Sequence, residues 1–282
     1  MDLTSEIERN VRAALAEDVG GGDLTAPLIP SGKRVRAAVL CRQQAVVCGQ
    51  PWFECTLRQL DPAAEIAWDV PEGATVAAGA RVCSVQGEAR ALLAAERVAL
   101  NFLQTLSGVA TITRRHVEAV AGTRAKIVDT RKTLPGLRLA QKYAVRVGGG
   151  SNHRMGLYDA MLIKENHIAA AGGIRQAVTQ ARKLERRGDW IQVEVENLGQ
   201  LKEALDAGAT MILLDNMDIA RMREAVNIAG GRAELEASGG ITLDNVRAIA
   251  ETGVDFISVG RITQSAPAVD IGLDYSLQEL PA

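Results

Sequence analysis

The second half of the chain alternates short apolar strands with amphipathic helices, and this alternation constrains the fold more than any other feature. Apolar runs that suit strands lie at residues 125–129, 160–164, 191–196, 211–215, 234–238 and 256–260. Helical periodicity fills residues 174–187, 198–207, 219–229 and 243–251 between the last five of them. Strand–helix units that repeat every 20 residues or so build parallel sheets, because a helix must carry the chain back across the sheet. We therefore expect an α/β domain over residues 114–270.

Polar residues at alternate positions within these strands distinguish two arrangements of such a sheet. Two strands show the pattern, with Gln192, Glu194 and Glu196 in one and Glu234, Glu236 and Ser238 in the other. The strands of a doubly wound sheet are apolar on both faces, because helices cover both. In a closed barrel one face of each strand points inward and can carry polar groups. The pattern favours a parallel α/β barrel of the TIM type, complete or incomplete.

Residues 1–113 follow a different pattern. Apolar runs broken by Gly and Pro indicate a small sheet, and they lie at residues 35–41, 45–48, 65–70 and 80–85. Residues 89–106 have the apolar spacing of a long helix. We expect an N-terminal α/β sandwich domain, joined by the C-terminal segment 271–282. Residues 71–87 resemble the hammerhead turns of lipoyl and biotinyl domains but have no lysine at a hairpin tip, which indicates shared geometry only.

Composition excludes several classes of function. Aromatic residues make up only 3% of the chain, which argues against single-stranded nucleic-acid binding. The net charge of -2 gives no general attraction for nucleic acid or an anionic membrane. The four cysteines have no metal-ligand spacing, which argues against a zinc site. No apolar stretch suits a bilayer span or a signal peptide, so we expect a cytoplasmic protein with small-molecule partners.

Positive charge is concentrated in one part of the chain. From Arg97 to Arg175 the sequence has thirteen Lys and Arg but only four acidic residues. Charged and glycine-rich residues also follow the predicted strands: Asp129, Arg131 and Lys132; Lys164; Glu194 and Glu196; Asp215 and Asn216; Ser238, Gly239 and Gly240; Gly260 and Arg261. Reactive groups of parallel barrels lie at the carboxyl ends of the strands. These residues are therefore expected to gather around one mouth.

The last two strand ends indicate a phosphate site. Residues 238–240 and 258–261 both lead from a strand into a helix start, where backbone N–H groups and the helix dipole favour an anion. The basic loops add Arg131 and the pair His153 and Arg154, and arginine suits bidentate recognition of carboxylate or phosphate. The sequence predicts a ligand with several negative charges.

Three segments of the basic region carry a specific resemblance: DTRKTLPGLR at 129–138, GGGSNHR at 148–154 and LIKENHI at 162–168. They resemble the quinolinate phosphoribosyltransferase family. The similarity extends to residues 17–25 and 96–103, although Val98 stands where the family more usually has Thr. The resemblance implies transfer of a ribosyl 5-phosphate from phosphoribosyl pyrophosphate to the ring nitrogen of quinolinate, with Mg²⁺. The products would be nicotinate mononucleotide, pyrophosphate and CO₂, in NAD biosynthesis.

The resemblance also implies roles for individual residues. The two carboxylates of quinolinate would be held by Arg131, His153, Arg154 and Lys164, together with Arg97 from the partner subunit of a homodimer or a larger assembly. The 5-phosphate would be cradled by Ser238, Gly239, Gly240 and Gly260. Lys132 would approach the pyrophosphate or phosphate, and Glu194 and Asp215 would bind the ribose hydroxyls and Mg²⁺. The groups that act in catalysis would be Lys132, Lys164, Glu194 and Asp215.

Three other functions are compatible with parts of the sequence. The first is that of the related phosphoribosyltransferase-like protein associated with molybdenum transport, and the complete Arg131–Lys132 and His153–Arg154 pairs argue against it. The second is a Schiff-base aldolase that uses Lys164, although such a lysine needs few surrounding arginines. The third, a binding module built on residues 71–87, leaves the charged mouth unexplained. We interpret His116 and His167 as structural histidines.

Overall fold

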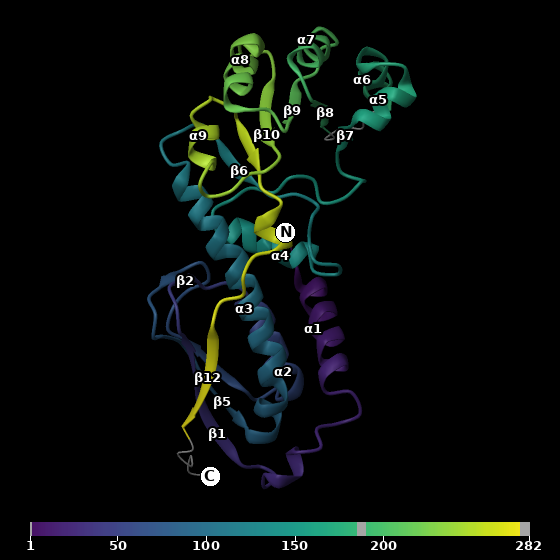
Figure 1. Ribbon diagram of the computed structural model, residues 1–282. Helices are drawn as coiled ribbons and strands as arrows, with labels where there is room; N and C mark the ends of the chain where they lie inside the picture. The colour runs from purple at the N-terminus through teal and green to yellow at the C-terminus, as the bar shows by residue number, and fades with distance from the viewer. Residues whose placement is uncertain (1, 185–189, 277–282) are drawn as a thin grey trace. The chain divides into compact units, whose positions relative to one another are not determined.

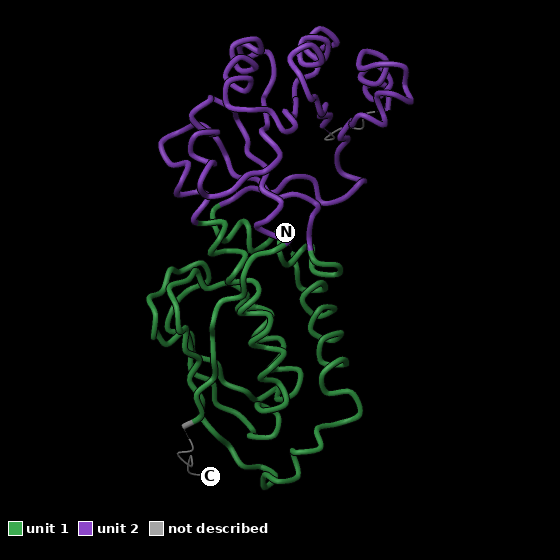
Figure 2. The backbone as a smooth tube through the Cα atoms, viewed as in Figure 1, with its two compact units in different colours: residues 1–114, 134–149, 265–282 green, residues 115–133, 150–264 purple. Residues whose placement is uncertain are grey.

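The computed structural model describes residues 2–184 and 190–276, and the chain divides into two compact units (Figure 2). The first unit comprises residues 1–114, 134–149 and 265–282, and the second comprises residues 115–133 and 150–264. The division differs from the predicted boundaries because residues 114, 134–149 and 265–270, predicted to lie in the second domain, belong to the first unit.

Helices and strands are labelled in Figure 1 in chain order. The helices are α1 (Thr4–Asp18), a 3-10 turn η1 (Ala26–Leu28), α2 (Gln50–Leu60), α3 (Ala89–Ala119), α4 (Arg138–Val147), α5 (Glu165–Ala171), α6 (Ile174–Leu184), α7 (Leu198–Asp206), α8 (Ile219–Ala229), α9 (Val246–Ala250) and α10 (Arg261–Gln264). The strands are β1 (Arg34–Cys41), β2 (Ala45–Val46), β3 (Glu65–Trp68), β4 (Thr75–Val76), β5 (Ala80–Glu88), β6 (Lys126–Val128), β7 (Met161–Ile163), β8 (Ile191–Val195), β9 (Met211–Asp215), β10 (Glu234–Ser238), β11 (Phe256–Ser258) and β12 (Ile271–Ser276).

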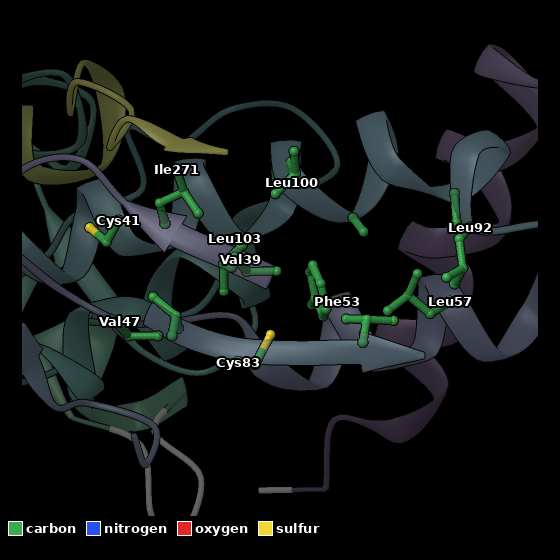
Figure 3. Packing of buried hydrophobic residues seen from close by; sticks show 14 of the residues in the cluster. Val39, Cys41, Val47, Phe53, Leu57, Cys83, Leu92, Leu100, Leu103 and Ile271 are labelled. Carbon is green, nitrogen blue, oxygen red and sulfur yellow. The ribbon is translucent and has the colours of Figure 1, made fainter. Parts of the chain in front are cut away.

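The first unit contains an antiparallel sheet with the strand order β12-β1-β5-β3 and a two-stranded pair β2-β4. Alternate residues of β1 are buried, as expected for a strand with one face on a core. That core packs β1 and β5 against α2 and α3, with Val39, Phe53 and Leu103 at its centre (Figure 3). Strand β12 pairs with β1, so residues 271–276 complete the N-terminal sheet.

The second unit contains a six-stranded parallel sheet with the order β6-β11-β10-β9-β8-β7. Helices α6, α7, α8 and α9 contact one another in sequence along this sheet (Figure 1). The predicted mixed α/β fold, with a parallel sheet and a separate antiparallel N-terminal sheet, is confirmed. Within the described residues no ladder joins the edge strands β6 and β7, and Val128 and Ser151 form an isolated parallel bridge beside β6.

The alternating polar residues lie on a shared face of the parallel sheet. Gln192 on β8 is 0% exposed and Glu236 on β10 is 2% exposed, and the Gln192 amide donates to the Glu236 carboxylate at 2.8 Å. Glu196 and Glu234, at the ends of their strands, are exposed. The polar face is therefore buried only along its middle, where the side chains can form hydrogen bonds with one another.

Several helices differ from the sequence predictions. The long helix predicted to end at residue 106 continues as α3 to Ala119. Residues 138–147 lie in the basic region between residues 129 and 164, for which the sequence predicts no helix, but they form α4; its buried side includes Gln141 and Lys142, which hide the apolar period. Helix α9 is shorter than predicted, since residues 242–245 form a turn closed by the Asn245 side chain. Helix α6 is described to Leu184, and the rest of the prediction to residue 187 lies outside the described residues.

Helix α4 belongs to the first unit through specific contacts. The Tyr143 ring lies 5.4 Å from the Trp52 ring, and its hydroxyl donates to the Glu72 carboxylate at 3.0 Å. The Glu72 carboxylate also accepts from the backbone N–H of Gly49 at 2.8 Å. The Tyr143 side chain of α4 thus has partners that lie about 70 to 90 residues away in the chain. In the part of the chain that is described, no helix is long and apolar enough to cross a membrane.

Replacing Gly108 by Ala is expected to destabilise the first unit. A Cβ atom at this position in α3 would collide with the carbonyl oxygen of Pro267 and lie 3.1 Å from its carbonyl carbon. Overpacking of this kind costs about 1–3 kcal/mol, so the melting temperature should fall by several degrees. Gly21→Ala is the matched control, because nothing lies within 4 Å of a Cβ there. Equal melting temperatures for the two variants would contradict the close approach of α3 and Pro267.

Candidate active site

Two adjoining cavities lie at the carboxyl edge of the parallel sheet, within the second unit. The first, of about 220 Å³, is lined by Thr130, Arg131, Lys132, His153, Arg154, Leu162, Lys164, Glu194, Leu213, Asp215, Glu236, Ser238 and Ser258. The second, of about 150 Å³, is lined by Thr130, Lys132, Ser238, Gly239, Gly240, Ile241, Thr242, Ser258, Gly260, Arg261 and Gln264. Every strand of the sheet or the loop that follows it contributes, and four residues line both cavities. We call the first the cationic cavity and the second the glycine-turn cavity.

The predicted site residues collect in these two cavities, with four exceptions. Arg97 lies in the first unit, exposed on α3. Glu196 is exposed beyond the end of β8, and Asn216 lines neither cavity. Asp129 lies behind the loop that follows β6. The remaining residues come from segments up to 130 positions apart in the chain.

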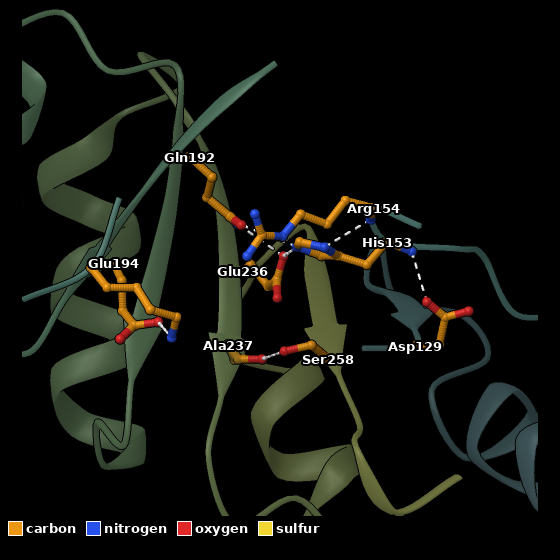
Figure 4. Close-up of polar contacts among 9 residues, drawn as sticks. Asp129, His153, Arg154, Gln192, Glu194, Glu236, Ala237 and Ser258 are labelled. Carbon is orange, nitrogen blue, oxygen red and sulfur yellow. Dashed lines mark hydrogen bonds and ion pairs between the residues drawn. The ribbon is translucent and has the colours of Figure 1, made fainter. Parts of the chain in front are cut away.

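Asp129 holds the loop that carries His153. It is 0% exposed, its carboxylate accepts from the Asn152 side-chain amide at 2.6 Å, and it accepts from the His153 backbone N–H at 2.9 Å (Figure 4). A carboxylate committed to two such donors is poorly placed to bind a ligand. Asp129 was predicted to lie with the charges at the mouth, but it is buried and lines neither cavity.

His153 is surrounded by protein groups on both sides of its ring. Its Nδ1 accepts the backbone N–H of Arg154 at 2.9 Å. Its Nε2 lies 3.1 Å from Gln192 Oε1 and 3.3 Å from Glu236 Oε2, and the ring packs edge-on against Trp190 at 4.9 Å. Glu236 was not among the predicted site residues, although its place on the polar face of β10 was a signal that could have found it.

Arg154 is a buried cation beside a second cation. The residue is 9% exposed, and its guanidinium donates to the carbonyl of Ala160 at 3.2 Å. Burial, followed by the positive charge of Arg131, lowers the pKa of Arg154 from its ordinary value, while Asp159 opposes this shift. Arginine stays charged at neutral pH even so. Two guanidinium groups that repel each other in a cavity are stabilised when an anionic ligand binds between them.

Lys164 ends β7 opposite Glu194 on β8. The Lys164 ammonium lies 2.5 Å from the Glu194 carboxylate, and the side chains are 45% and 16% exposed. Lys164 is the N-cap residue of α5. The His167 side chain caps this helix start, because its Nδ1 accepts the backbone N–H of Lys164 at 3.0 Å. The predicted structural role of His167 fits this contact. His116 is buried in α3, outside both cavities.

The glycine-turn cavity is shaped by backbone that only glycine adopts easily. Gly239 and Gly240 have φ angles of 99° and 62° directly after β10. Asn216 is the one described non-glycine residue with positive φ, at 52°, and it packs against Gly239. Gly260 leaves room for Lys132, since a Cβ there would lie 2.9 Å from the Lys132 Cδ. Lys132 therefore lies where the two cavities meet.

The carboxylates of Glu194 and Asp215 line the cationic cavity together. Among the described residues no group of three His, Cys, Asp or Glu side chains could hold a metal by itself. Two carboxylates completed by water and phosphate oxygens are a ligand set that suits Mg²⁺, which rarely uses an all-protein cage. The residues present fit Mg²⁺ that arrives with a phosphorylated substrate.

Fold and site together define a class of protein. A parallel α/β sheet ends in a cation-rich cavity that opens beside a glycine-rich turn, and this combination belongs to enzymes that bind a phosphorylated substrate next to a second anion. No cysteine lines either cavity, and the described cysteines are free thiols, three of them buried.

Comparison with known families identifies the particular one. Residues 23–107 match the N-terminal domain of quinolinate phosphoribosyl transferase, and residues 109–274 match its C-terminal domain. The chain belongs to the quinolinate phosphoribosyltransferase family.

Individual relatives agree over almost the whole chain. A probable nicotinate-nucleotide pyrophosphorylase (carboxylating) of Bacillus subtilis is 41% identical over 93% of this chain and 90% of its own length. The solved nicotinate-nucleotide pyrophosphorylase of Francisella tularensis has 46% identity and a TM-score of 0.94, and covers 98% of both chains. That of Ehrlichia chaffeensis has 42% identity and a TM-score of 0.90, and covers 94% of this chain and 97% of its own.

Proposed function

We propose that the chain is a pentosyltransferase that transfers the ribosyl 5-phosphate of phosphoribosyl pyrophosphate to quinolinate. The products are nicotinate mononucleotide, pyrophosphate and CO₂, in NAD biosynthesis. The observation that carries this proposal is the meeting of Arg131, His153, Arg154 and Lys164 in one cavity that opens onto the turn at Gly239. Membership of the family supports this proposal, and that membership does not suit an aldolase or a binding module.

The cationic cavity suits the two carboxylates of quinolinate. Arg131, Arg154 and Lys164 place three positive charges around about 220 Å³, a space that takes one small aromatic ring. Two guanidinium groups can each bind a carboxylate through paired hydrogen bonds. The repulsion between Arg131 and Arg154 favours a dianion over a monoanion. Quinolinate therefore fits better than nicotinate, which has one carboxylate fewer.

The glycine-turn cavity suits the 5-phosphate. Backbone N–H groups of Gly239 and Gly240 stand between the end of β10 and the next helix, and Gly260 stands before α10. Glu194 and Asp215 line the adjoining cationic cavity, from which they would reach the ribose hydroxyls. When bound, Mg²⁺ would supply charge neutralisation for the pyrophosphate, held by the same two carboxylates. Lys132, at the junction, stabilises the leaving pyrophosphate oxygens.

The chemistry needs no nucleophile from the protein. The quinolinate ring nitrogen attacks the anomeric carbon as its bond to pyrophosphate breaks, and the carboxylates of Glu194 and Asp215 offset the positive charge on the sugar. The ribosylated ring is cationic and takes up the electron pair released when the adjacent carboxylate leaves as CO₂. A proton then replaces CO₂ on the ring carbon. The protein contributes position and charge to both steps.

The parallel sheet is proposed to be a barrel opened along one seam. Its order places sequential strands side by side from β7 to β11 and then returns to β6, which is the order of a closed α/β barrel. The seam lies between β6 and β7, where the isolated bridge of Val128 and Ser151 lies beside β6. The domains are proposed to be an N-terminal sandwich and this barrel, with the excursion 134–149 assigned to the former.

A homodimer with Arg97 supplied by the partner subunit is also proposed. Arg97 is exposed on α3 and absent from both cavities of its own chain. One helical turn further, Asn101 lines an open cavity of about 390 Å³ between α1 and α3, within the first unit. The cationic cavity of a second copy would lie against this face of α3. Arg97 would then add a further cation for a dianionic substrate.

Mixing two inactive variants tests the shared site. Arg97→Ala and Lys164→Ala should each be inactive alone, and a refolded equal mixture should recover about a quarter of the wild-type activity, since half the dimers are hybrids with one intact site. An equal mixture of Arg97→Ala and Arg131→Ala should behave in the same way. A mixture of Lys164→Ala and Arg131→Ala should recover nothing, because both residues come from the same chain. Recovery in that last mixture would overturn the assignment.

One assay tests the function itself. The purified protein is supplied with quinolinate, phosphoribosyl pyrophosphate and Mg²⁺, and nicotinate mononucleotide and CO₂ are measured. Nicotinate replaces quinolinate in a parallel reaction, and we expect it to be a poor acceptor. Absence of product with quinolinate, or equal rates with the two acceptors, would refute the proposal. Borohydride trapping with carbonyl compounds serves as the control for Schiff-base chemistry at Lys164.

A further inference from the structure

Glu236 is a buried carboxylate in the lining of the cationic cavity, and the proposed reaction does not use it directly. It lies in the middle of β10 and is 2% exposed. Its Oε2 accepts from the Gln192 amide at 2.8 Å and lies 3.3 Å from His153 Nε2 (Figure 4). Its Oε1 has no hydrogen-bond partner of normal geometry within the described part of the chain. A buried carboxylate with an unsatisfied oxygen is costly, so its retention calls for an explanation beyond packing.

Its effect on His153 can be read from the hydrogen-bond directions. The Arg154 backbone N–H points at His153 Nδ1 from 2.9 Å, so Nδ1 must present its lone pair. The ring proton of neutral His153 is then on Nε2, which faces Glu236 Oε2 and Gln192 Oε1. Both of these groups are acceptors. One side of the ring is therefore fixed by a donor and the other by acceptors, and only one tautomer satisfies both.

Glu236 is suited to this task because it stays ionised. Burial, the largest single influence, raises the pKa of Glu236, but hydrogen bonds from His153, Gln192 and Ser258 oppose it, and the pKa lies below the ordinary value. At neutral pH the group is therefore a carboxylate, which accepts more strongly than a neutral amide. The Ser258 hydroxyl also makes a long contact of 3.4 Å to the carbonyl of Ala237 (Figure 4).

We propose that Glu236 is a positioning residue that acts through His153 to hold the quinolinate subsite in its binding geometry. The Glu236 carboxylate stabilises the Nε2–H tautomer, which is the same tautomer in which Nδ1 accepts the Arg154 N–H. The hydrogen bond fixes the start of the Arg154 side chain, whose guanidinium is held at its other end by Ala160. Asp129 secures the His153 backbone independently. The inference rests on the proposed function only for the identity of the ligand.

The first test measures the tautomer without any substrate. The chain has three histidines, and a His153→Asn variant assigns the His153 signals in a ¹⁵N-edited NMR spectrum. Wild-type His153 should show a protonated Nε2 and an unprotonated Nδ1. Glu236→Gln replaces the carboxylate by an amide of the same shape, and the His153 signals should move towards a mixture of tautomers. An unchanged tautomer in Glu236→Gln would overturn the proposal, whatever reaction the protein catalyses.

The second test measures binding through activity. Glu236→Gln should raise KM for quinolinate by about ten- to a hundredfold, because a charged hydrogen bond is lost beneath the subsite. KM for phosphoribosyl pyrophosphate should stay within about twofold, since Glu236 itself does not line the glycine-turn cavity. The melting temperature should also stay near that of the wild type. Glu234→Gln is the matched control on the same strand, because Glu234 is exposed, and it should change nothing.

A double-mutant cycle separates positioning from a merely structural role. In the His153→Asn background, which keeps an acceptor for the Arg154 N–H, Glu236→Gln should add little further loss, because its partner is already gone. An equally large additional loss in that background, or an equal rise in both KM values, would show that Glu236 acts through general packing. If wild-type protein proves inactive with quinolinate, the proposed function fails, while the NMR test still decides the role of Glu236.

Discussion

Lys164→Ala is expected to lower kcat/KM for quinolinate by about a thousandfold or more while the chain stays folded. The variant loses a cation of the cavity, and it also leaves the Glu194 carboxylate, 16% exposed and 2.5 Å from the missing ammonium, without its partner. An unpaired carboxylate then repels the incoming dianion. Truncating one member of such a pair costs about 2–5 kcal/mol, and every 1.4 kcal/mol is about tenfold. Initial rates over a range of quinolinate concentrations measure the effect.

The fold should survive because the Lys164 side chain is 45% exposed. Circular dichroism and the melting temperature check this directly. Arg131→Ala should act in the same direction, since it removes a guanidinium from the same cavity. Lys202→Ala, on the exposed side of α7, is the charge-matched control and should keep full activity. Near-normal rates in both Lys164→Ala and Arg131→Ala would refute the placement of quinolinate.

Gly239→Ala is expected to raise KM for phosphoribosyl pyrophosphate by about a hundredfold or more. The residue has φ of 99°, and a Cβ atom would collide with the side-chain oxygen of Asn216 and lie 2.6 Å from its Cγ. The turn must therefore open, which moves the backbone N–H groups away from the 5-phosphate. Backbone strain contributes about 1–3 kcal/mol, and a lost oxyanion contact of this kind contributes a hundredfold or so. Calorimetric titration with phosphoribosyl pyrophosphate measures the loss.

The control for Gly239→Ala must carry the same backbone strain without the collision. Gly231→Ala meets this need, because Gly231 has φ of 79°, lines neither cavity, and would have nothing within 4 Å of its Cβ. It should lose stability but keep its affinity. Equal affinities for phosphoribosyl pyrophosphate in wild type and Gly239→Ala would show that the 5-phosphate does not bind at this turn.

Much of the second unit could be predicted from the sequence because its strands are buried among helices. The strands at 211–215 and 234–238 have the predicted bounds, since the first is a short apolar run, the second alternates polar and apolar residues, and a glycine-containing turn precedes each. Helix α8 likewise begins and ends as predicted. The cations at the strand ends were also predictable, because parallel strands bring their carboxyl ends to one edge whatever the details of packing.

The predictions made from the sequence failed at positions where polar side chains are buried. Gln141 and Lys142 are 2% and 1% exposed, so α4 has no clean apolar period and was taken for a loop. Asp129 has the charge expected of a ligand-binding residue, but its carboxylate accepts a hydrogen bond from the backbone N–H of His153. The Gln141 side chain likewise accepts from the backbone N–H of Leu134. A single sequence does not show which backbone groups a buried polar side chain meets.

The amino-acid sequence by itself determined the alternation of strands and helices, the family, and the set of cations and glycines that line the two cavities. These follow from local periodicity and from short motifs, whose physical causes act over a few residues. The tertiary structure alone decided which polar groups line the cavities and which hold other residues in place, as Asp129 holds the backbone of His153. That distinction depends on burial and on hydrogen-bond direction, which arise only when distant segments pack together.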